Sequence, residues 1–341
     1  MTFPMWDFTV GANGIRLSEP ADPVSGAARG SALDRSPPLT GRSLMSVDAA
    51  SDAYASPGSR FRHLLTNSEP VVFPLVLDPL SALFAERAGF RALYLGGATL
   101  GYVKATTEAQ LSLTRIVDVA LEIRAATDLP LILDGQCAWG DPMHVEHTVR
   151  MCEAAGIAGI EIEDQLMPKR AHHHIGVEHL VPMELMVEKI KVAVAARRDS
   201  GFVVIARTNA CRSEGLDAAV RRAEAYRDAG ADMLFVLEKT PDQVRSIGER
   251  VPGPLFYLLH AGLGSLPLPL DVLGELGFRA VVDPLTPFYT RQHAMRLSYE
   301  SLARGSSDPG VAAMFREETE MIHDVLRLEH LLDIERRSVE R

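Results

Sequence analysis

The sequence predicts an α/β protein built as a (β/α)8 barrel with a helical C-terminal extension. Eight apolar runs of strand length alternate with segments of helical periodicity over about 250 residues, a size typical of such barrels. No GxGxxG motif opens the first helix, which disfavours an open dinucleotide-binding sheet. Polar side chains close seven of the eight runs, and a barrel gathers its strand ends at one face. These strand-end residues are Asp78, Gly96 with Gly97, Asp134 with Gln136, Glu163, Arg207, Glu238, His260 and Asp283.

Strands and helices are expected to alternate from residue 59 onward. The expected strands cover residues 71–78, 92–97, 130–134, 159–163, 202–208, 233–239, 254–260 and 279–285. The expected helices cover residues 59–65, 79–89, 107–127, 183–198, 216–230, 241–251, part of 268–277, and 288–305. Between the third and fourth strands, Val145, Val149, Cys152 and Ala155 recur at helical spacing. Apolar runs of four to eight residues between helices are typical of a parallel sheet.

Three regions follow from this pattern. Residues 1–57 are rich in Ser, Pro, Gly, Ala and Asp and have few periodic apolar positions, so we expect an irregular N-terminal extension. Residues 58–305 hold the barrel. Residues 306–341 are amphipathic, and we expect a C-terminal helical region used for packing or oligomerisation.

Composition excludes several classes of protein. The 341 residues are 47% hydrophobic and 23% charged, which is typical of a globular protein. A net charge of −10 argues against a nucleic-acid partner, which requires a basic patch. No apolar run reaches the length of a membrane span, and the N-terminus lacks the features of a secretory signal. Three cysteines without CxxC spacing fit a reducing compartment, so we expect a cytoplasmic protein with no membrane partner.

The segment from Pro130 to His174 predicts a functional site. It reads as a strand ending at Asp134, a helix, and a strand ending at Glu163. The two strands of such a βαβ unit are parallel neighbours, so the two acids should lie side by side at the face where barrels bind ligands. Neighbouring carboxylates repel unless a cation or proton offsets their charge. The alternative is a pair of solvated or helix-capping acids without a site.

Several motifs resemble those of the isocitrate lyase and phosphoenolpyruvate mutase superfamily, in particular its methylisocitrate lyase and oxaloacetate decarboxylase types. The motifs are DPLSALFAERAGFRALYLGG, LPLILDGQCAWGDP, AGIAGIEIEDQLMPKR, VVIARTNA and RAEAYRDAGADMLFVLE. The resemblance runs from about Ser59 to Arg304. It implies a (β/α)8 barrel whose last helix is often exchanged between subunits, assembled as a homodimer or homotetramer. It also implies an enzyme that uses Mg²⁺, with Mn²⁺ as an alternative, and stabilises the enolate of a small carboxylate substrate.

The resemblance assigns a metal site to three positions. Asp134 matches the aspartate that binds the metal directly, and Glu163 matches the acid of the EDQ motif that reaches the metal through water. Gln136 stands where the family has a second aspartate, and it offers one neutral carbonyl oxygen.

Substrate and catalytic roles fall on five other positions. Arg207 matches the arginine that holds a substrate carboxylate, a role suited to its bidentate fork. Gly96 and Gly97 match a loop whose backbone amides hold the substrate, and Trp139 occupies an aromatic position of the metal-binding motif. Lys169 matches the lysine of the mobile loop after the fourth strand.

The same loop departs from the family pattern. Family lyases carry KRCGH there, and its cysteine delivers a proton, whereas this chain has Ala171 at that position. His173 matches the histidine of the motif and is a candidate general acid, since histidine titrates near neutral pH. His172 stands at a glycine position. The alternative is that the three consecutive histidines form a solvated loop without chemistry.

Two further family residues are hard to place. The acidic segment after the second strand is shortened to TLGYVKATTE, so its aspartate has no clear counterpart. The glutamate of the sixth strand has only a displaced match in Glu238, and the asparagine after the seventh appears as Leu259 or His260.

The favoured function is a Mg²⁺-dependent carbon–carbon lyase acting on a small 2-hydroxy or 2-oxo carboxylate through an enolate, with Arg207, Lys169 and His173 as catalytic residues. One alternative keeps the superfamily but changes the reaction to decarboxylation, hydrolysis or phosphonate chemistry. Another is a barrel that has lost catalysis and serves as a binding protein.

Overall fold

The computed structural model describes residues 56–238, 240–306 and 309–339, and it confirms the barrel. Eight parallel strands are arranged in the order β1-β8-β7-β6-β5-β4-β3-β2, and a parallel bridge between Leu75 and Tyr94 joins the two ends of this order. The strands are β1 (Val71–Pro74), β2 (Leu93–Leu95), β3 (Leu131–Asp134), β4 (Gly159–Glu163), β5 (Val203–Thr208), β6 (Met233–Val236), β7 (Leu255–Leu258) and β8 (Phe278–Asp283).

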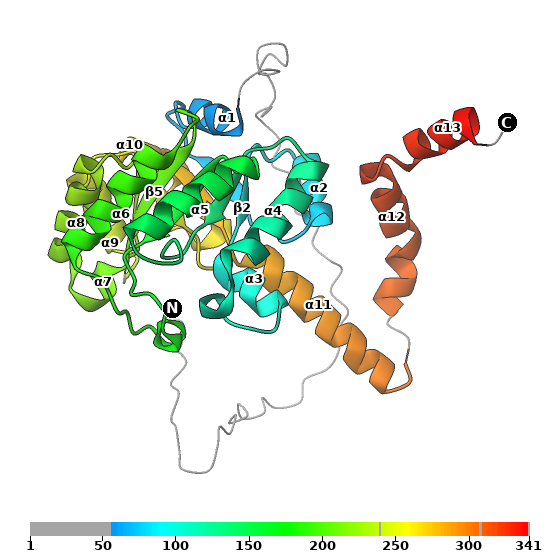
Figure 1. Cartoon of the computed structure of the whole chain (residues 1–341). Helices are drawn as coiled ribbons and strands as arrows, with labels where there is room; N and C mark the ends of the chain where they lie inside the picture. The colour runs from blue at the N-terminus through cyan, green and yellow to red at the C-terminus, as the bar shows by residue number, and fades with distance from the viewer. Residues whose placement is uncertain (1–55, 239, 307–308, 340–341) are drawn as a thin grey trace, which may run out of the picture. The chain divides into compact units, whose positions relative to one another are not determined.

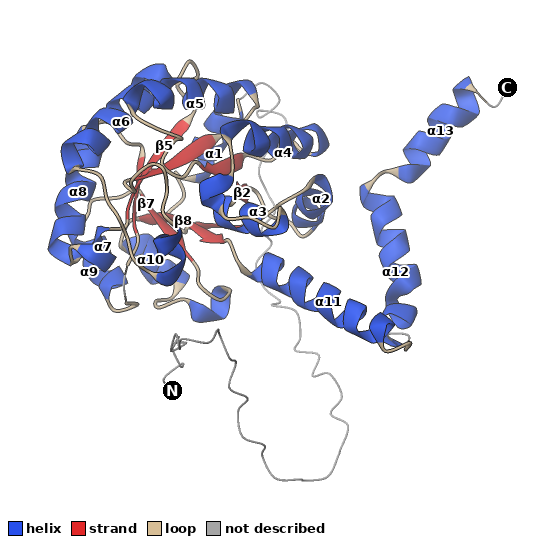
Figure 2. Ribbon diagram, turned by 60° about the horizontal axis from the view of Figure 1, so that its bottom comes forward, coloured by secondary structure: helices blue, strands red, loops and turns tan. Residues whose placement is uncertain are grey.

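A ring of helices surrounds the strands (Figures 1 and 2). The α-helices are α1 (Pro57–Leu64), α2 (Pro79–Arg87), α3 (Gly97–Val103), α4 (Leu113–Ala126), α5 (Pro142–Ala154), α6 (Met183–Ala196), α7 (Ala210–Ser213), α8 (Leu216–Asp228), α9 (Gln243–Arg250), α10 (Leu270–Glu275), α11 (Thr286–Ala303), α12 (Pro309–Val325) and α13 (Leu328–Ser338). Three short 3-10 helices are η2 (Glu108–Gln110), η3 (Ala171–Ile175) and η4 (Leu263–Ser265). None of the helices described is long and apolar enough to cross a membrane.

Aromatic side chains fill part of the barrel interior. Phe73, Tyr94 and Phe256 meet with ring centroids 6.0–6.5 Å apart, and Phe235 packs on Phe256 at 5.2 Å. Successive residues of a strand face opposite sides, so these rings point inward while their neighbours in the sequence face the helices. The interior is therefore a packed apolar core, and any charged group among these rings needs a partner.

Several elements differ from those expected: β1 ends at Pro74, four residues before the expected strand end, and α7 adds a short helix after β5. The helix expected over residues 107–127 is divided into η2 and α4, because the Ser112 side chain accepts a hydrogen bond from the Arg115 amide and starts a new helix. Helix α3 was not expected, since its glycines disfavour helix in isolation.

Two strand-end acids act as helix caps. The Asp78 side chain accepts a hydrogen bond from the amide of Ser81 and caps α2. Asp283 accepts hydrogen bonds from the amides of Leu285 and Thr286 at the start of α11. Both acids therefore stabilise the start of a helix.

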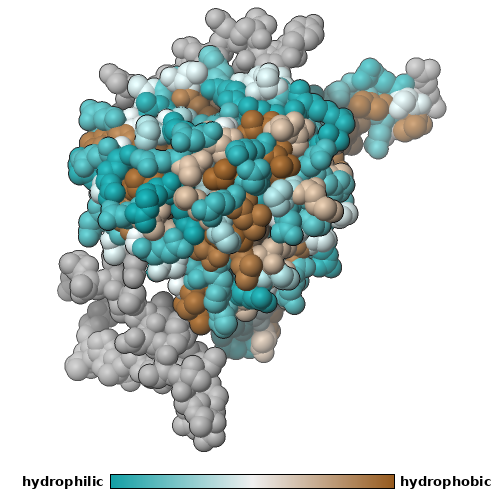
Figure 3. All heavy atoms as spheres, turned by 60° about the vertical axis from the view of Figure 1, so that its left-hand side comes forward, coloured by the Kyte–Doolittle hydropathy of each residue, from teal (hydrophilic) through white to brown (hydrophobic). Residues whose placement is uncertain are grey.

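Two terminal regions flank the barrel in the sequence. The expected N-terminal extension lies outside the described residues except at its end, where Pro57 begins α1. The expected C-terminal helical region contains α12 and α13, and α12 contacts α2 through an ion pair between Asp324 and Arg87. Apolar side chains are exposed on α11, α12 and α13, and brown patches mark the C-terminal helices in Figure 3.

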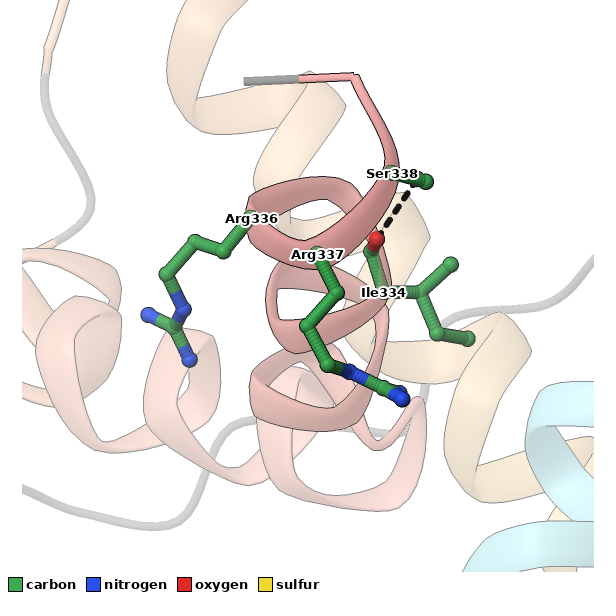
Figure 4. Close-up of a pocket in the computed structure, with 4 residues that line it drawn as sticks. All are labelled: Ile334, Arg336, Arg337 and Ser338. Atoms are coloured by element: carbon green, nitrogen blue, oxygen red, sulfur yellow. Dashed lines mark hydrogen bonds between the residues drawn. The ribbon is translucent and has the colours of Figure 1, made fainter. Parts of the chain in front are cut away.

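A shallow hollow occurs on α13 (Figure 4). Ile334, Arg336, Arg337 and Ser338 line it, and all four belong to one helix. Arg337 pairs with Asp333 at 2.9 Å, and the Ser338 hydroxyl donates to the Ile334 carbonyl. The hollow shares no residue with the strand ends, so we place the candidate site at the barrel.

Candidate functional site

The carboxyl ends of β3, β4 and β5 bring the predicted site residues together. Asp134 on β3 is in register with Glu161 on β4, and Glu163 on β4 is in register with Arg207 on β5. Parallel pairing places these side chains at one end of the barrel, as the sequence predicts.

Asp134 is held in place by the backbone around it. One carboxylate oxygen accepts a hydrogen bond from the Gly97 amide at 3.0 Å, and the other accepts one from the Gln136 amide at 3.0 Å. A Cβ atom at Gly97 would lie 3.2 Å from both Asp134 Oδ2 and Gln136 Nε2, so a side chain there would crowd both groups. Each carboxylate oxygen keeps a lone pair for a further ligand.

Glu163 lies among positive groups. Its Oε1 lies 2.5 Å from Lys169 Nζ. Its Oε2 accepts a hydrogen bond from the side-chain Nδ2 of Asn209 at 2.9 Å and lies 3.5 Å from Arg207 Nε. Burial disfavours the charged form, but Lys169 and Arg207 outweigh burial and hold the pKa of Glu163 below its usual range. Glu163 is therefore a carboxylate at neutral pH.

Glu108 completes this group. It lies on η2, is buried, and forms an ion pair with Lys169. Burial raises the pKa of Glu108, and Lys169 opposes this effect. Burial alone would lower the pKa of Lys169, but Glu163 and Glu108 together raise it. Glu108 thus lies in the segment between β2 and β3. The family has an aspartate in this segment for which the sequence showed no clear counterpart.

Glu161 is a second acid that the sequence reasoning missed. It is 1% exposed and accepts hydrogen bonds from Arg207 Nη1 at 2.7 Å and from the Tyr94 hydroxyl at 3.0 Å. Burial raises its pKa to about 7, Arg207 opposes the rise, and Asp134 adds to it. Burial disfavours the charge of Arg207, but Glu163 and Glu161 raise its pKa.

The loop after β4 places His173 beside two acids. His173 Nε2 lies 3.4 Å from Glu108 Oε1, and Nδ1 lies 3.1 Å from Glu178 Oε2. His174 Nδ1 lies 3.1 Å from the Tyr102 hydroxyl, and His172 pairs with His179. The three consecutive histidines therefore face different partners, and His173 alone among them contacts Glu108.

Three other residues serve the loops around the site. The Trp139 indole donates to the Leu111 carbonyl at 2.8 Å, so it fixes the turn after β3 to the segment after η2. Among the described residues, no hydrogen bond joins the indole to Glu108, Asp134, Glu161 or Glu163. The buried Cys137 thiol donates to Glu163 Oε1 at 3.9 Å, and burial raises its pKa, which disfavours a reactive thiolate. Asp164 accepts from the hydroxyls of Thr208 at 2.7 Å and Tyr226 at 2.8 Å, which anchors β4 to β5 and α8.

The donor set fits a divalent cation on two observations. First, the four acids Glu108, Asp134, Glu161 and Glu163 face the two permanent cations Lys169 and Arg207, and the imidazole of His173 lies 3.4 Å from Glu108. The acids therefore outnumber the permanent cations.

Second, Gln136 is 1% exposed, and neither atom of its side-chain amide has a hydrogen-bond partner. An orphaned amide beside Asp134 is suited to a water or oxygen held by a cation. Among the residues described, no three His, Cys, Asp or Glu side chains form a group that could hold a metal ion, and Glu163 is turned toward Lys169.

Comparison with known proteins identifies the family. A model of the phosphoenolpyruvate phosphomutase family matches residues 61–303, which is more than half of the chain. The chain belongs to this family.

Its relatives include several lyases. The 2-methylisocitrate lyase of Aeropyrum pernix is 39% identical over 235 residues, which cover 68% of this chain and 75% of that protein. The 2,3-dimethylmalate lyase of Eubacterium barkeri is 32% identical over 281 residues, which cover 81% of this chain and 96% of that protein. A solved phosphonopyruvate hydrolase in complex with oxalate and Mg²⁺ has a TM-score of 0.74 at 27% identity, covering 84% of this chain and all of that one. These matches confirm the superfamily that the motifs indicate.

Proposed function

We propose that the chain is a carbon–carbon lyase acting on a small 2-hydroxy or 2-oxo carboxylate. The observation that carries the proposal is the cluster at the ends of β3, β4 and β5, where Asp134 and Glu163 lie near the buried guanidinium of Arg207. Lyases among the relatives act on small carboxylates, as their names state, which supports the same substrate class here.

Asp134, Gln136 and Glu163 are the residues that would hold Mg²⁺ or Mn²⁺, and Glu108 adds a nearby acid. A bound Mg²⁺ would polarise a substrate oxygen and offset the charge of an enolate. Arg207 would bind a substrate carboxylate. The Gly97 amide lies at the same edge, and Lys169 keeps the loop after β4 joined to the site through Glu163 and Glu108.

His173 is the proposed general acid. His173 lies 3.4 Å from Glu108 and 3.1 Å from Glu178, on the loop where family lyases carry their proton donor. Ala171, which replaces the family cysteine, has no proton to give. This alanine also favours a second candidate, decarboxylation or hydrolysis of a 2-oxo acid, in which solvent supplies the proton.

The test is a panel of 2-hydroxy and 2-oxo acids with Mg²⁺ or Mn²⁺, read by NMR for release of a smaller oxo acid. The His173→Ala variant should lose about 10²–10⁴-fold in turnover and keep its metal affinity. His172→Ala is the matched control, because it removes a neighbouring imidazole that pairs with His179. Equal activity of both variants and the wild type would exclude His173 as the acid and favour the second candidate. If no acid in the panel is turned over, the proposed lyase reaction is refuted.

We also propose that the protein assembles as a homodimer or homotetramer through its last helices. Exposed apolar side chains on these helices support it, among them Leu302, Phe315, Leu331 and Leu332. A location in the cytoplasm fits the absence of a membrane-spanning helix from the described residues.

A further inference from the structure

Glu161 lies inside the barrel, below Glu163 on the same strand. Residues of a strand alternate between faces, so Glu161 and Glu163 both point inward, while Ile160 and Ile162 point toward the helices. Barrel interiors are normally filled by apolar side chains, and the ring of Phe235 lies on this inner face too. A buried acid at this depth is costly, so its partners indicate what it does.

Both oxygens of Glu161 are occupied. Oε1 accepts from Arg207 Nη1 at 2.7 Å, and Oε2 accepts from the Tyr94 hydroxyl at 3.0 Å. Arg207 is held further by Asn209 Oδ1, 2.9 Å from its Nε, and its guanidinium carbon lies 4.8 Å from the centre of the Phe235 ring. The arginine available to bind a carboxylate is therefore already neutralised by an acid of the protein.

Among the described residues, the other basic group beside this cluster is His173, 3.4 Å from Glu108. Lys169 is shared between Glu108 and Glu163. At the neighbouring strand end, Glu238 pairs with His260 at 2.9 Å and adds a further acid. A divalent cation would offset at most two of these negative charges, so it would leave little positive charge for a polyanion.

We propose that Glu161 is a specificity-determining residue, which selects small acids with one or two carboxylates over tricarboxylates. This inference rests on the proposed function, because it assumes that Arg207 receives a substrate carboxylate. Each carboxylate brought near Glu161 in a buried site is repelled by it, at a cost on the order of tenfold or more in affinity. 2-Methylisocitrate carries three carboxylates and 2,3-dimethylmalate carries two, so the second kind of substrate suits this site.

The experiment measures binding rather than turnover. Calorimetry with Mg²⁺, at a pH on the alkaline side of neutral, compares pyruvate, oxalate and tricarballylate as ligands with one, two and three carboxylates. The wild type should bind pyruvate and oxalate at least about tenfold more tightly than tricarballylate. Glu161→Gln removes one negative charge and should reduce this preference by about tenfold.

Two controls separate charge from structure. Glu161→Asp keeps the charge and should keep the wild-type order of the three ligands, even where all three bind more weakly. Glu146→Gln changes an exposed acid on α5, paired with Arg150, and should leave both the order and the affinities unchanged.

Several results would overturn the proposal. If Glu161→Gln changes the three affinities by the same factor, Glu161 only supports Arg207. If the wild type binds tricarballylate most tightly, or binds none of the three ligands, the proposal is wrong, and the variants need not be measured. If the three ligands bind in the expected order of affinity but no substrate is turned over, this inference stands and the proposed function is refuted. If a substrate is turned over but the ligands do not bind in that order, the proposed function stands and this inference is refuted.

Discussion

Replacing Glu161 by glutamine should change how stability depends on pH, in a direction fixed by its surroundings. Burial raises the pKa of this carboxyl from its ordinary value of 4.5 to about 7. In the unfolded chain the group loses its proton near pH 4.5, and in the folded chain it keeps the proton until about pH 7. Between these values the folded state binds more protons, so the free energy of unfolding falls as pH rises.

The magnitude follows from the size of the shift. A rise of about 2.5 in pKa, at about 1.4 kcal/mol for each unit, corresponds to about 3 kcal/mol lost across the window. Glutamine cannot ionise, so Glu161→Gln should gain about 3 kcal/mol relative to the wild type between pH 4.5 and 7. For a chain of this size the difference in melting temperature should change by about 6–12 °C across the same window.

The assay is thermal unfolding followed by circular dichroism at a series of pH values, with a chelator present to keep metal ions from the site. The lowered pKa of Glu163 acts at more acidic pH, and the raised pKa values of Glu108 and Asp164 affect wild type and variant alike. Glu146→Gln should follow the wild-type curve, because its carboxylate is exposed and its ion pair contributes little. If the melting temperatures of the wild type and Glu161→Gln change with pH in parallel, Glu161 does not have the raised pKa assigned to it.

The remaining predictions concern the metal and the assembly. Gln136→Asp adds a carboxylate beside Asp134 at a residue whose φ of 48° aspartate tolerates, so calorimetry should show Mg²⁺ binding tightened at least about tenfold, and Asp134→Ala should abolish it. Unchanged Mg²⁺ binding in both variants would remove the metal from this site. Sedimentation at micromolar concentration should show a dimer or tetramer, and Leu331→Asp on α13 should weaken it, since a charge replaces an exposed apolar side chain. A wild-type monomer under these conditions would contradict assembly through the last helices.

The sequence was sufficient for the barrel and for the strand-end residues of the site. Strand length and alternation predicted eight parallel strands, and parallel pairing alone then placed Asp134, Glu163 and Arg207 at one end. The structure adds the contacts that decide their charge, because Lys169 reaches Glu163 from a loop whose path the apolar pattern does not specify.

Glu108 and Glu161 were missed for different physical reasons. Glu108 lies on a short 3-10 helix inside a segment that reads as one continuous helix, so its contact with Lys169 depends on a loop path that has no periodic signal. Glu161 did have a signal. An acid in the middle of the apolar run of β4, two residues before Glu163, must share its inward face, and alternation of the strand would have placed it there.

The end of β4 shows how the side of the strand determines the role of an acid. Asp164 and Glu161 each pair with an arginine and a tyrosine, Arg222 with Tyr226 in one case and Arg207 with Tyr94 in the other. The two acids are three positions apart in the sequence, an odd offset, so they fall on opposite faces.

The outward acid ties the strand to α8, where the arginine and tyrosine lie one helical turn apart, and this arrangement needs no ligand to be complete. The inward acid meets its partners from β2 and β5 at the open end of the barrel, beside Asp134 and the unpartnered amide of Gln136. The same kinds of side chain therefore stabilise the fold on one face and, on the other, belong to an acidic cluster whose negative charge a divalent cation would offset.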